Sequence, residues 1–146
     1  MADILKPESE SQLADAINWA QSESVPLAVK GQGTKGGLGR PTQTHYTLDM
    51  TGFSGIDLYE PEELVLTAKA GTPIAEIQQA LAEKNQELRF EPGDLGRLYG
   101  HAPGGGTLGG LVAANWAGPR RIKDGAARDH VLGIKGVTGR GEFIKA

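Results

Sequence analysis

Three glycine-rich loops constrain this chain more than any other feature of its sequence. They read VKGQGTKGGLGR from residue 29, KAGTPIAEI from residue 69 and APGGGTLGGLVAANWAG from residue 102. Glycine has no Cβ and reaches positive φ, so several successive N–H groups can turn towards one anion. One loop of this kind is a weak signal, but three at this spacing predict a chain folded around a long cofactor with several phosphates.

The composition is that of a single globular domain. The 146 residues include 22 glycines, which cluster in the loops without a fixed period, so collagen-like and low-complexity chains are excluded. The net charge is −3 and no basic stripe is present, which gives no reason to expect nucleic acid as a partner. Cysteine is absent, which excludes disulfides, thiol nucleophiles and covalent cysteinyl links.

The two ends of the chain bear on where the protein is located and on whether the sequence is a piece of a longer protein. The N-terminus, MADILKPESES, is polar and acidic, unlike a signal peptide, and no run approaches membrane-spanning length. We therefore expect a cytoplasmic protein with no membrane span. Residues 137–141 and 142–146 resemble two strands of a hairpin, and a strand at the last residue leaves an unpaired sheet edge. We expect a piece of a longer protein.

Apolar spacing predicts three helices. The first covers residues 8–22, with Ser9 or Ser11 as its N-cap. The second begins at Thr72-Pro73, where proline suits the first turn, and its inner face carries isoleucine and leucine at positions 74, 77 and 81. The third, residues 108–116, consists mostly of small residues.

Strand patterns complete an α+β domain without internal repeats. Residues 25–29 are predicted to form a buried strand that leads into the first glycine loop, and residues 45–49 a second short strand. Residues 56–59 and 64–69 are predicted to form a hairpin around Glu60-Pro61-Glu62-Glu63.

The first loop, residues 30–35, follows a strand and offers a nest of N–H donors in which a pyrophosphate would fit. Its sequence matches neither a Walker A motif nor GxGxxG, and no helical pattern follows, so P-loop and Rossmann sites are disfavoured. Taken alone, such a loop is more often a plain surface connection between two strands.

The third loop carries more weight. Each glycine inside a helix costs about 1 kcal/mol, which a chain tolerates where something large and flat must approach the backbone. The alternative is a tightly packed helix crossing with no ligand. Gly109-Gly110 and Gly118 lie on both sides of Asn115, which favours the ligand.

Several motifs together resemble one family. They are LYEPEEL from residue 58, AGTPIAEI from 70, FEP from 90, TLGG from 107, GPRR from 118 and GAARDHVLG from 125. With them the chain resembles the FAD-binding domain of flavoproteins of the vanillyl-alcohol oxidase/p-cresol methylhydroxylase (PCMH) type, and within that family the FAD-binding subunits of bacterial glycolate oxidases. The resemblance covers nearly the whole chain.

The resemblance implies a PCMH-type α+β fold in which two α/β subdomains clasp an extended FAD. The first subdomain would be residues 1–52, and the second residues 53–146. The second would be incomplete, because the family's FAD domain continues further and is followed by a cap domain. Residues 122–124 depart from the more aromatic or apolar stretch common in the family.

The resemblance also implies a set of cofactor-binding residues. Those around the FAD pyrophosphate would be Lys30, Gly31, Gln32, Gly33, Thr34 and Lys35. Those between the pyrophosphate and the flavin would be Thr107, Gly109 and Gly110, and those near the isoalloxazine or ribityl chain Asn115, Gly118, Gly125 and Asp129. Relatives with covalent FAD often use a histidine in or next to the first loop, where this chain has Thr34, so we expect non-covalent FAD.

The implied function is that of the FAD-binding subunit, or a fragment of it, of a flavin-dependent 2-hydroxy-acid oxidoreductase. Glycolate is the implied substrate, other subunits of a glycolate oxidase-type complex are the implied partners, and the fragment alone is expected to be inactive. Two alternatives remain open: a non-catalytic FAD-binding or assembly module, and a fragment too short to hold FAD.

The other reactive side chains support no further site. The three histidines lack metal-ligand spacing, so we predict no metal site. His101 is expected to face solvent from a loop and His130 to play a structural role. Arg120, Arg121 and Arg128 suit a phosphate or carboxylate and equally a surface or intersubunit contact. No catalytic base can be named, and in the family it would be sought in the cap or a partner subunit.

Overall fold

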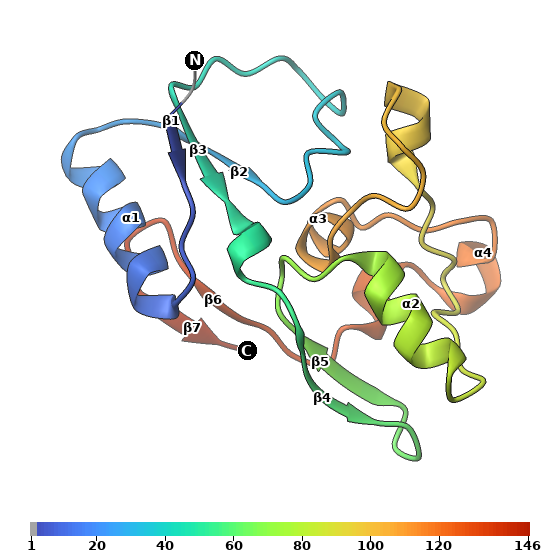
Figure 1. The fold of residues 1–146 in the computed structure, drawn as a ribbon. Helices are drawn as coiled ribbons and strands as arrows, with labels where there is room; N and C mark the ends of the chain where they lie inside the picture. Colours follow the sequence, from blue (N-terminus) through green and yellow to red (C-terminus); the bar gives the residue numbers. More distant parts are fainter. Residues whose placement is uncertain (1–2) are drawn as a thin grey trace.

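A three-stranded parallel sheet organises the N-terminal part of the chain in the computed structural model, which describes residues 3–146 (Figure 1). Its spatial order is β1 (Asp3–Leu5), β3 (Tyr46–Asp49), β2 (Leu27–Lys30). The central strand pairs with both neighbours, and its Leu48 is buried. The strand β1 was not predicted, because three residues are too few for a periodic pattern and long-range pairing with β3 creates the strand.

The strand β2 differs from its prediction. We predicted a buried strand over residues 25–29, but β2 begins at Leu27 and lies at the edge of the sheet, where Val29 is 68% exposed. The prediction of burial is therefore wrong. Pro26 cannot donate to a strand ladder, so pairing starts after it, and the apolar run did not reveal that β2 has only one neighbour.

Helix α1 (Glu10–Ser22) confirms the first predicted helix and its cap. The Ser9 hydroxyl accepts a hydrogen bond of 3.2 Å from the backbone N–H of Gln12, which satisfies a donor in the first turn. Trp19 packs edge-on against Tyr46 with ring centroids 4.9 Å apart, so this helix lies against the parallel sheet (Figure 1).

A second layer of the molecule contains the main hydrophobic core. The hairpin of β4 (Ile56–Glu60) and β5 (Val65–Ala68) confirms the predicted hairpin, and α2 (Ile74–Ala82) confirms the second helix. The inner face of α2 is buried as predicted. The buried residues of this core are Ile74, Ile77, Leu81, Phe90, Leu111 and Ala127.

Helix α3 (Leu108–Ala113) is shorter than the predicted helix over residues 108–116. Asn115 takes a left-handed conformation with φ +45°, and the N–H of Trp116 turns back to the carbonyl of Leu111 at 3.2 Å. Such a closing bond ends a helix, and it was not visible in the small-residue pattern. The single-turn helix α4 (Arg121–Asp124) follows.

Short 3₁₀ helices occupy three of the connections, at Met50–Gly52, Leu95–Tyr99 and Ala127–His130. The last two strands, β6 (Lys135–Val137) and β7 (Phe143–Lys145), pair in a hairpin, as predicted. The predicted first strand over residues 137–141 is wrong, because β6 shares only residue 137 with it and residues 138–142 form the turn, closed by a bond of 2.9 Å from the N–H of Gly141 to the carbonyl of Thr138. This hairpin lies beside α1 (Figure 1), and Gly141 packs against the Asn18 side chain. The division at residue 52 stays a prediction. Among the helices of residues 3–146, none has the length and apolar character needed to cross a bilayer.

Candidate cofactor site

Two of the glycine loops meet in the fold, although they are far apart in the sequence. The backbone N–H of Gly106 donates a hydrogen bond of 2.7 Å to the Gln32 Oε1 atom. A Cβ atom on Gly31 would collide with the Thr107 side chain, and one on Gly105 would lie 2.7 Å from the Thr34 Cγ2 atom. Glycine at these two positions therefore allows the loops after β2 and before α3 to touch.

The second glycine loop is joined to the third by backbone pairing. The N–H of Ile74 donates to the carbonyl of Gly106 at 3.0 Å, and the N–H of Leu108 donates to the carbonyl of Thr72 at 2.9 Å. Thr107 is 3% exposed, and its hydroxyl accepts from the N–H of Gly110 at 3.4 Å. The starts of α2 and α3 are thus held side by side, and all three glycine loops converge.

Free donors remain in the first loop. Within residues 3–146, the backbone N–H groups of Gly33, Thr34 and Lys35 donate to no protein acceptor. Gly33 has a φ of +73°, a conformation in which successive N–H groups form a concave nest for an anion. Lys30 lies just before this nest in β2, opposite Asp49 of β3, with an exposed side chain. The loop therefore offers an anion a set of unused backbone donors.

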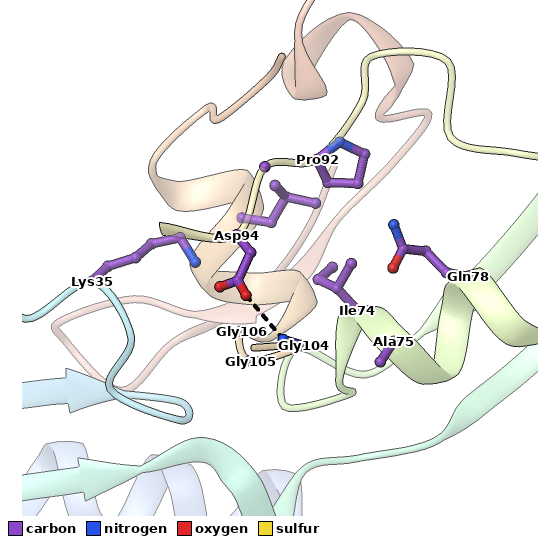
Figure 2. Close-up of a pocket in the computed structure, with 11 residues that line it drawn as sticks. Lys35, Ile74, Ala75, Gln78, Pro92, Asp94, Gly104, Gly105 and Gly106 are labelled. Atoms are coloured by element: carbon purple, nitrogen blue, oxygen red, sulfur yellow. Dashed lines mark hydrogen bonds between the residues drawn. The ribbon is translucent and has the colours of Figure 1, made fainter. Parts of the chain in front are cut away.

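Lys35 adds a positive charge at the junction of the loops. It lines a cavity of about 50 Å³ together with Asp94 and residues 104–106, and in Figure 2 its side chain extends towards Asp94. Burial lowers the pKa of the Lys35 ammonium, and the negative charge of Asp94 offsets part of that effect. The cavity is small against the roughly 300–1,000 Å³ of ligand pockets, so it suits a single group of a larger ligand.

The sequence patterns did not indicate Asp94 as a site residue. Its Oδ1 atom accepts from the N–H of Gly96 and its Oδ2 atom from the N–H of Gly104, both at 2.9 Å. The first bond caps the 3₁₀ helix Leu95–Tyr99, and the second ties the start of the third glycine loop to the same carboxylate. An aspartate beside glycines often bonds the main chain two residues on, which was the available signal. The bond to Gly104 follows only from the fold.

Gly109 and Gly110 have different surroundings. A Cβ on Gly109 would lie 2.9 Å from the Ala70 Cβ and 3.0 Å from the Ala70 carbonyl oxygen, so packing within the chain explains this glycine. A Cβ on Gly110 would lie 3.4 Å from the Thr107 hydroxyl and 3.7 Å from the Lys35 Nζ atom. These are ordinary contacts, so nothing inside the chain requires glycine at position 110.

The remaining predicted site residues make a separate set of contacts. Asn115 Oδ1 accepts from the N–H of Arg128 at 3.0 Å, and Asp129 Oδ2 accepts from the N–H of Ala126 at 2.8 Å. A Cβ on Gly125 would lie 3.0 Å from the Asp129 side chain, and one on Gly118 would lie 2.8 Å from Glu91. These contacts order the turns that follow α3, and none of them involves residues 30–35.

Residues 2–146 match the family model described as the FAD binding domain. The chain belongs to this family. It is 41% identical over 133 residues to the glycolate oxidase subunit GlcE of Escherichia coli strain K12, covering 91% of this chain and 36% of that protein. It is 25% identical over 144 residues to the D-lactate dehydrogenase of Archaeoglobus fulgidus, covering 97% of this chain and 30% of that protein.

Solved structures show the same fold. The 6-hydroxy-D-nicotine oxidase of Arthrobacter nicotinovorans superposes with a TM-score of 0.74 at 18% identity, over 98% of this chain and 29% of that one. The grass pollen allergen Phl p 4 superposes with a TM-score of 0.78 at 20% identity, over 98% of this chain and 28% of that one. The chain thus spans about a third of the length of its relatives. The predicted PCMH-type fold and the FAD cofactor are confirmed.

The loops of this FAD-binding domain fit the pyrophosphate group of a dinucleotide. FAD carries a pyrophosphate, and the first loop offers unused N–H donors beside the Lys35 ammonium. Gly31 and Gly105 bring the two loops close enough to act on one group, and Gly110 leaves the backbone open next to Lys35. The chemistry of these donors therefore suits the cofactor of the family.

Other candidate residues of the FAD-binding domain have partners of their own. The Arg120 guanidinium lies 2.8 Å from a Glu87 oxygen and 3.1 Å from a Glu91 oxygen, so two carboxylates engage it. The exposed His130 holds its Nε2 atom 2.7 Å from the Asp124 carbonyl, and its ring lies beside Phe90. These contacts support the structural role predicted for His130.

Proposed function

We propose that this chain is the FAD-binding part of a flavin-dependent 2-hydroxy-acid oxidoreductase of the glycolate oxidase type. The observation that carries the proposal is the meeting of two glycine loops, 74 residues apart in the sequence, around free N–H donors and a lysine. The 41% identity to the glycolate oxidase subunit GlcE supports glycolate as the substrate of the whole protein.

In this proposal the first loop binds the pyrophosphate. Lys30, Gly31, Gln32, Gly33, Thr34 and Lys35 line that end of the cofactor, with Thr107, Gly109 and Gly110 on the flavin side. Gly110 is the best supported of the last three, because the packing of the chain does not require glycine there. The cofactor stays non-covalent, since Thr34 stands where a linking histidine would be and the sequence has no cysteine.

The flavin end is assigned to Asn115, Gly118, Gly125 and Asp129. These residues order the turns around α4 through hydrogen bonds at Asn115 and Asp129, so their proposed contribution is the shape of the flavin rim. When bound, FAD supplies the hydride acceptor for the C2 carbon of a hydroxy acid, and the protein binds, orients and tunes it. Residues 3–146 hold no base that we assign to this reaction.

The names of the relatives support 2-hydroxy acids as the proposed substrate class. They include a D-lactate dehydrogenase and a D-2-hydroxyglutarate dehydrogenase besides the glycolate oxidase subunit, and all three names refer to 2-hydroxy acids. We infer that this chain acts with other subunits of a glycolate oxidase-type complex in the cytoplasm. Alone, it is expected to bind FAD without turning over substrate.

An FAD titration of the 146-residue chain, followed by flavin fluorescence, tests the proposal. Gly110→Leu fills the space beside Lys35 and is expected to weaken FAD binding at least tenfold, whereas Gly139→Leu, at an open position, leaves it unchanged. Circular dichroism checks that both variants remain folded. Failure of the wild-type chain to bind FAD, or equal binding by both variants, would contradict the proposed site.

Activity is tested in the assembled complex. Glycolate is expected to bleach the visible flavin absorption band when oxygen is excluded, because the substrate reduces the cofactor. A flavin that stays oxidised with glycolate, lactate and 2-hydroxyglutarate would identify a non-catalytic module instead.

A further inference from the structure

One donor of the third glycine loop is already occupied by a carboxylate of the chain itself. Asp94 Oδ2 accepts from the N–H of Gly104 at 2.9 Å, while Oδ1 is engaged by Gly96. A loop that only collected anions would keep such a donor free, because an extra negative charge repels the ligand. The carboxylate thus places a fixed negative charge beside the proposed phosphate site.

Asp94 shares its cavity with a positive charge. Lys35 lines the same space, and Figure 2 shows its side chain extending towards Asp94, whose carboxylate is bonded to Gly104. The Lys35 ammonium is half-buried, and the attraction of Asp94 compensates part of its lost hydration. The other polar side chains at the cavity and at the contact between the loops are neutral, namely Gln32, Thr34, Gln78 and Thr107, so Lys35 and Asp94 set the charge of the site.

We propose that Lys35 and Asp94 select the charge of the phosphate ligand, Lys35 by attracting a pyrophosphate diester and Asp94 by repelling a terminal phosphate. This inference rests on the proposed function. It adds a way in which the site discriminates between a pyrophosphate diester and a ligand with a terminal phosphate. Each phosphate of a dinucleotide is a diester with one negative charge. A terminal phosphate carries about −1.5 to −2 at neutral pH, because its second pKa is about 6.

The difference of charge decides the preference. A pyrophosphate diester brings two charges to the site, and the Lys35 ammonium offsets one of them. The terminal phosphate of a nucleoside diphosphate adds most of one further negative charge. This charge lies against the Asp94 carboxylate in a partly desolvated cavity and is repelled by it. Specificity of this kind is built from a repulsive element as well as an attractive one.

Calorimetric titrations with FAD, ADP and riboflavin test the roles of the two residues. Asp94→Asn is expected to strengthen ADP binding about tenfold relative to FAD, because one repulsive charge is lost. Lys35→Met should weaken the binding of FAD and of ADP about tenfold each. The binding of riboflavin, which has no phosphate, should stay unchanged. Lys84→Met, at an exposed position after α2, is the matched control. An unchanged ratio of FAD to ADP affinity in Asp94→Asn would overturn the proposal.

A measurement on the wild-type chain tests the same charge selection without any variant, so it still applies if Asp94→Asn does not fold. ADP-ribose carries a pyrophosphate diester on the same adenosine as ADP, so the wild-type chain should bind it about tenfold more tightly than ADP. Equal affinities would overturn the charge selection while leaving FAD binding intact. A wild-type chain that binds no FAD would overturn both the proposed function and this inference.

Discussion

Gln32 accepts a hydrogen bond of 2.7 Å from the backbone N–H of Gly106, and this bond joins two loops that are 74 residues apart. Gly106 is buried, and the Gln32 side chain is the acceptor of its N–H, so removing this acceptor leaves a buried donor without its protein partner. A side chain on a surface loop therefore sets the position of the loop that precedes α3.

The Gln32 bond yields a first prediction. Gln32→Ala leaves the Gly106 N–H unpaired and is expected to lower the free energy of unfolding by about 1–3 kcal/mol. Gln32→Glu keeps an acceptor and should retain more of that stability, but its added negative charge should weaken FAD binding. Urea unfolding and FAD titration of the two variants separate the effects, and equal losses of stability would contradict this role of Gln32.

The contact between Gly105 and Thr34 leads to a second prediction. Gly105→Ala would place a Cβ 2.7 Å from the Thr34 Cγ2 atom, which is expected to cost about 1–3 kcal/mol through overpacking. Thr34→Ser removes that methyl group, so the double variant should recover much of the lost stability. A double-mutant cycle measures the coupling, expected between about 0.5 and 3 kcal/mol. Simple additivity would show that the two loops do not pack as described.

A third prediction distinguishes neighbouring glycines in α3. Gly109→Ala would press against the Ala70 backbone, so we expect a loss of about 1–3 kcal/mol. Gly110→Ala has room for its methyl group and should stabilise the helix by up to about 1 kcal/mol. Gly139→Ala, with no neighbour within 4 Å, serves as the control for chemical denaturation. The reverse order of stabilities for Gly109 and Gly110 would contradict the packing of α3 on Ala70.

Lys35 provides a prediction in which stability and binding change in opposite directions. Burial lowers the pKa of this lysine from its usual 10.5, so charging it costs more in the folded than in the unfolded chain. That cost is fully present below the lowered pKa and is relieved as the pH rises to 10.5. Lys35→Met is therefore expected to raise the unfolding temperature at pH 7, with a gain that shrinks towards pH 10.5, while FAD binding weakens.

Thermal unfolding between pH 7 and pH 10.5, alongside FAD titration, checks the prediction for Lys35. Lys84→Met should change neither quantity, because that side chain is exposed. A Lys35 variant that loses stability and FAD affinity together would instead indicate that the lysine mainly supports the fold.

Local sequence patterns were sufficient to predict the helices α1 and α2, the family and its cofactor. Helical spacing and a serine cap placed α1, the buried positions 74, 77 and 81 placed α2, and the glycine motifs identified the family and its cofactor. Such features can be read along the chain, because the residues that cause them lie within a few positions of one another.

Which distant segments of the chain come into contact follows only from the folded structure. The short strand β1 exists because β3 pairs with it, and Val29 is exposed because β2 lies at the edge of the sheet. The bond between Gln32 and Gly106 and the cavity shared by Lys35 and Asp94 likewise join residues with no local pattern in common. Long-range pairing and burial depend on the whole packed chain, so the charges of the site could be known only once the loops had been brought together.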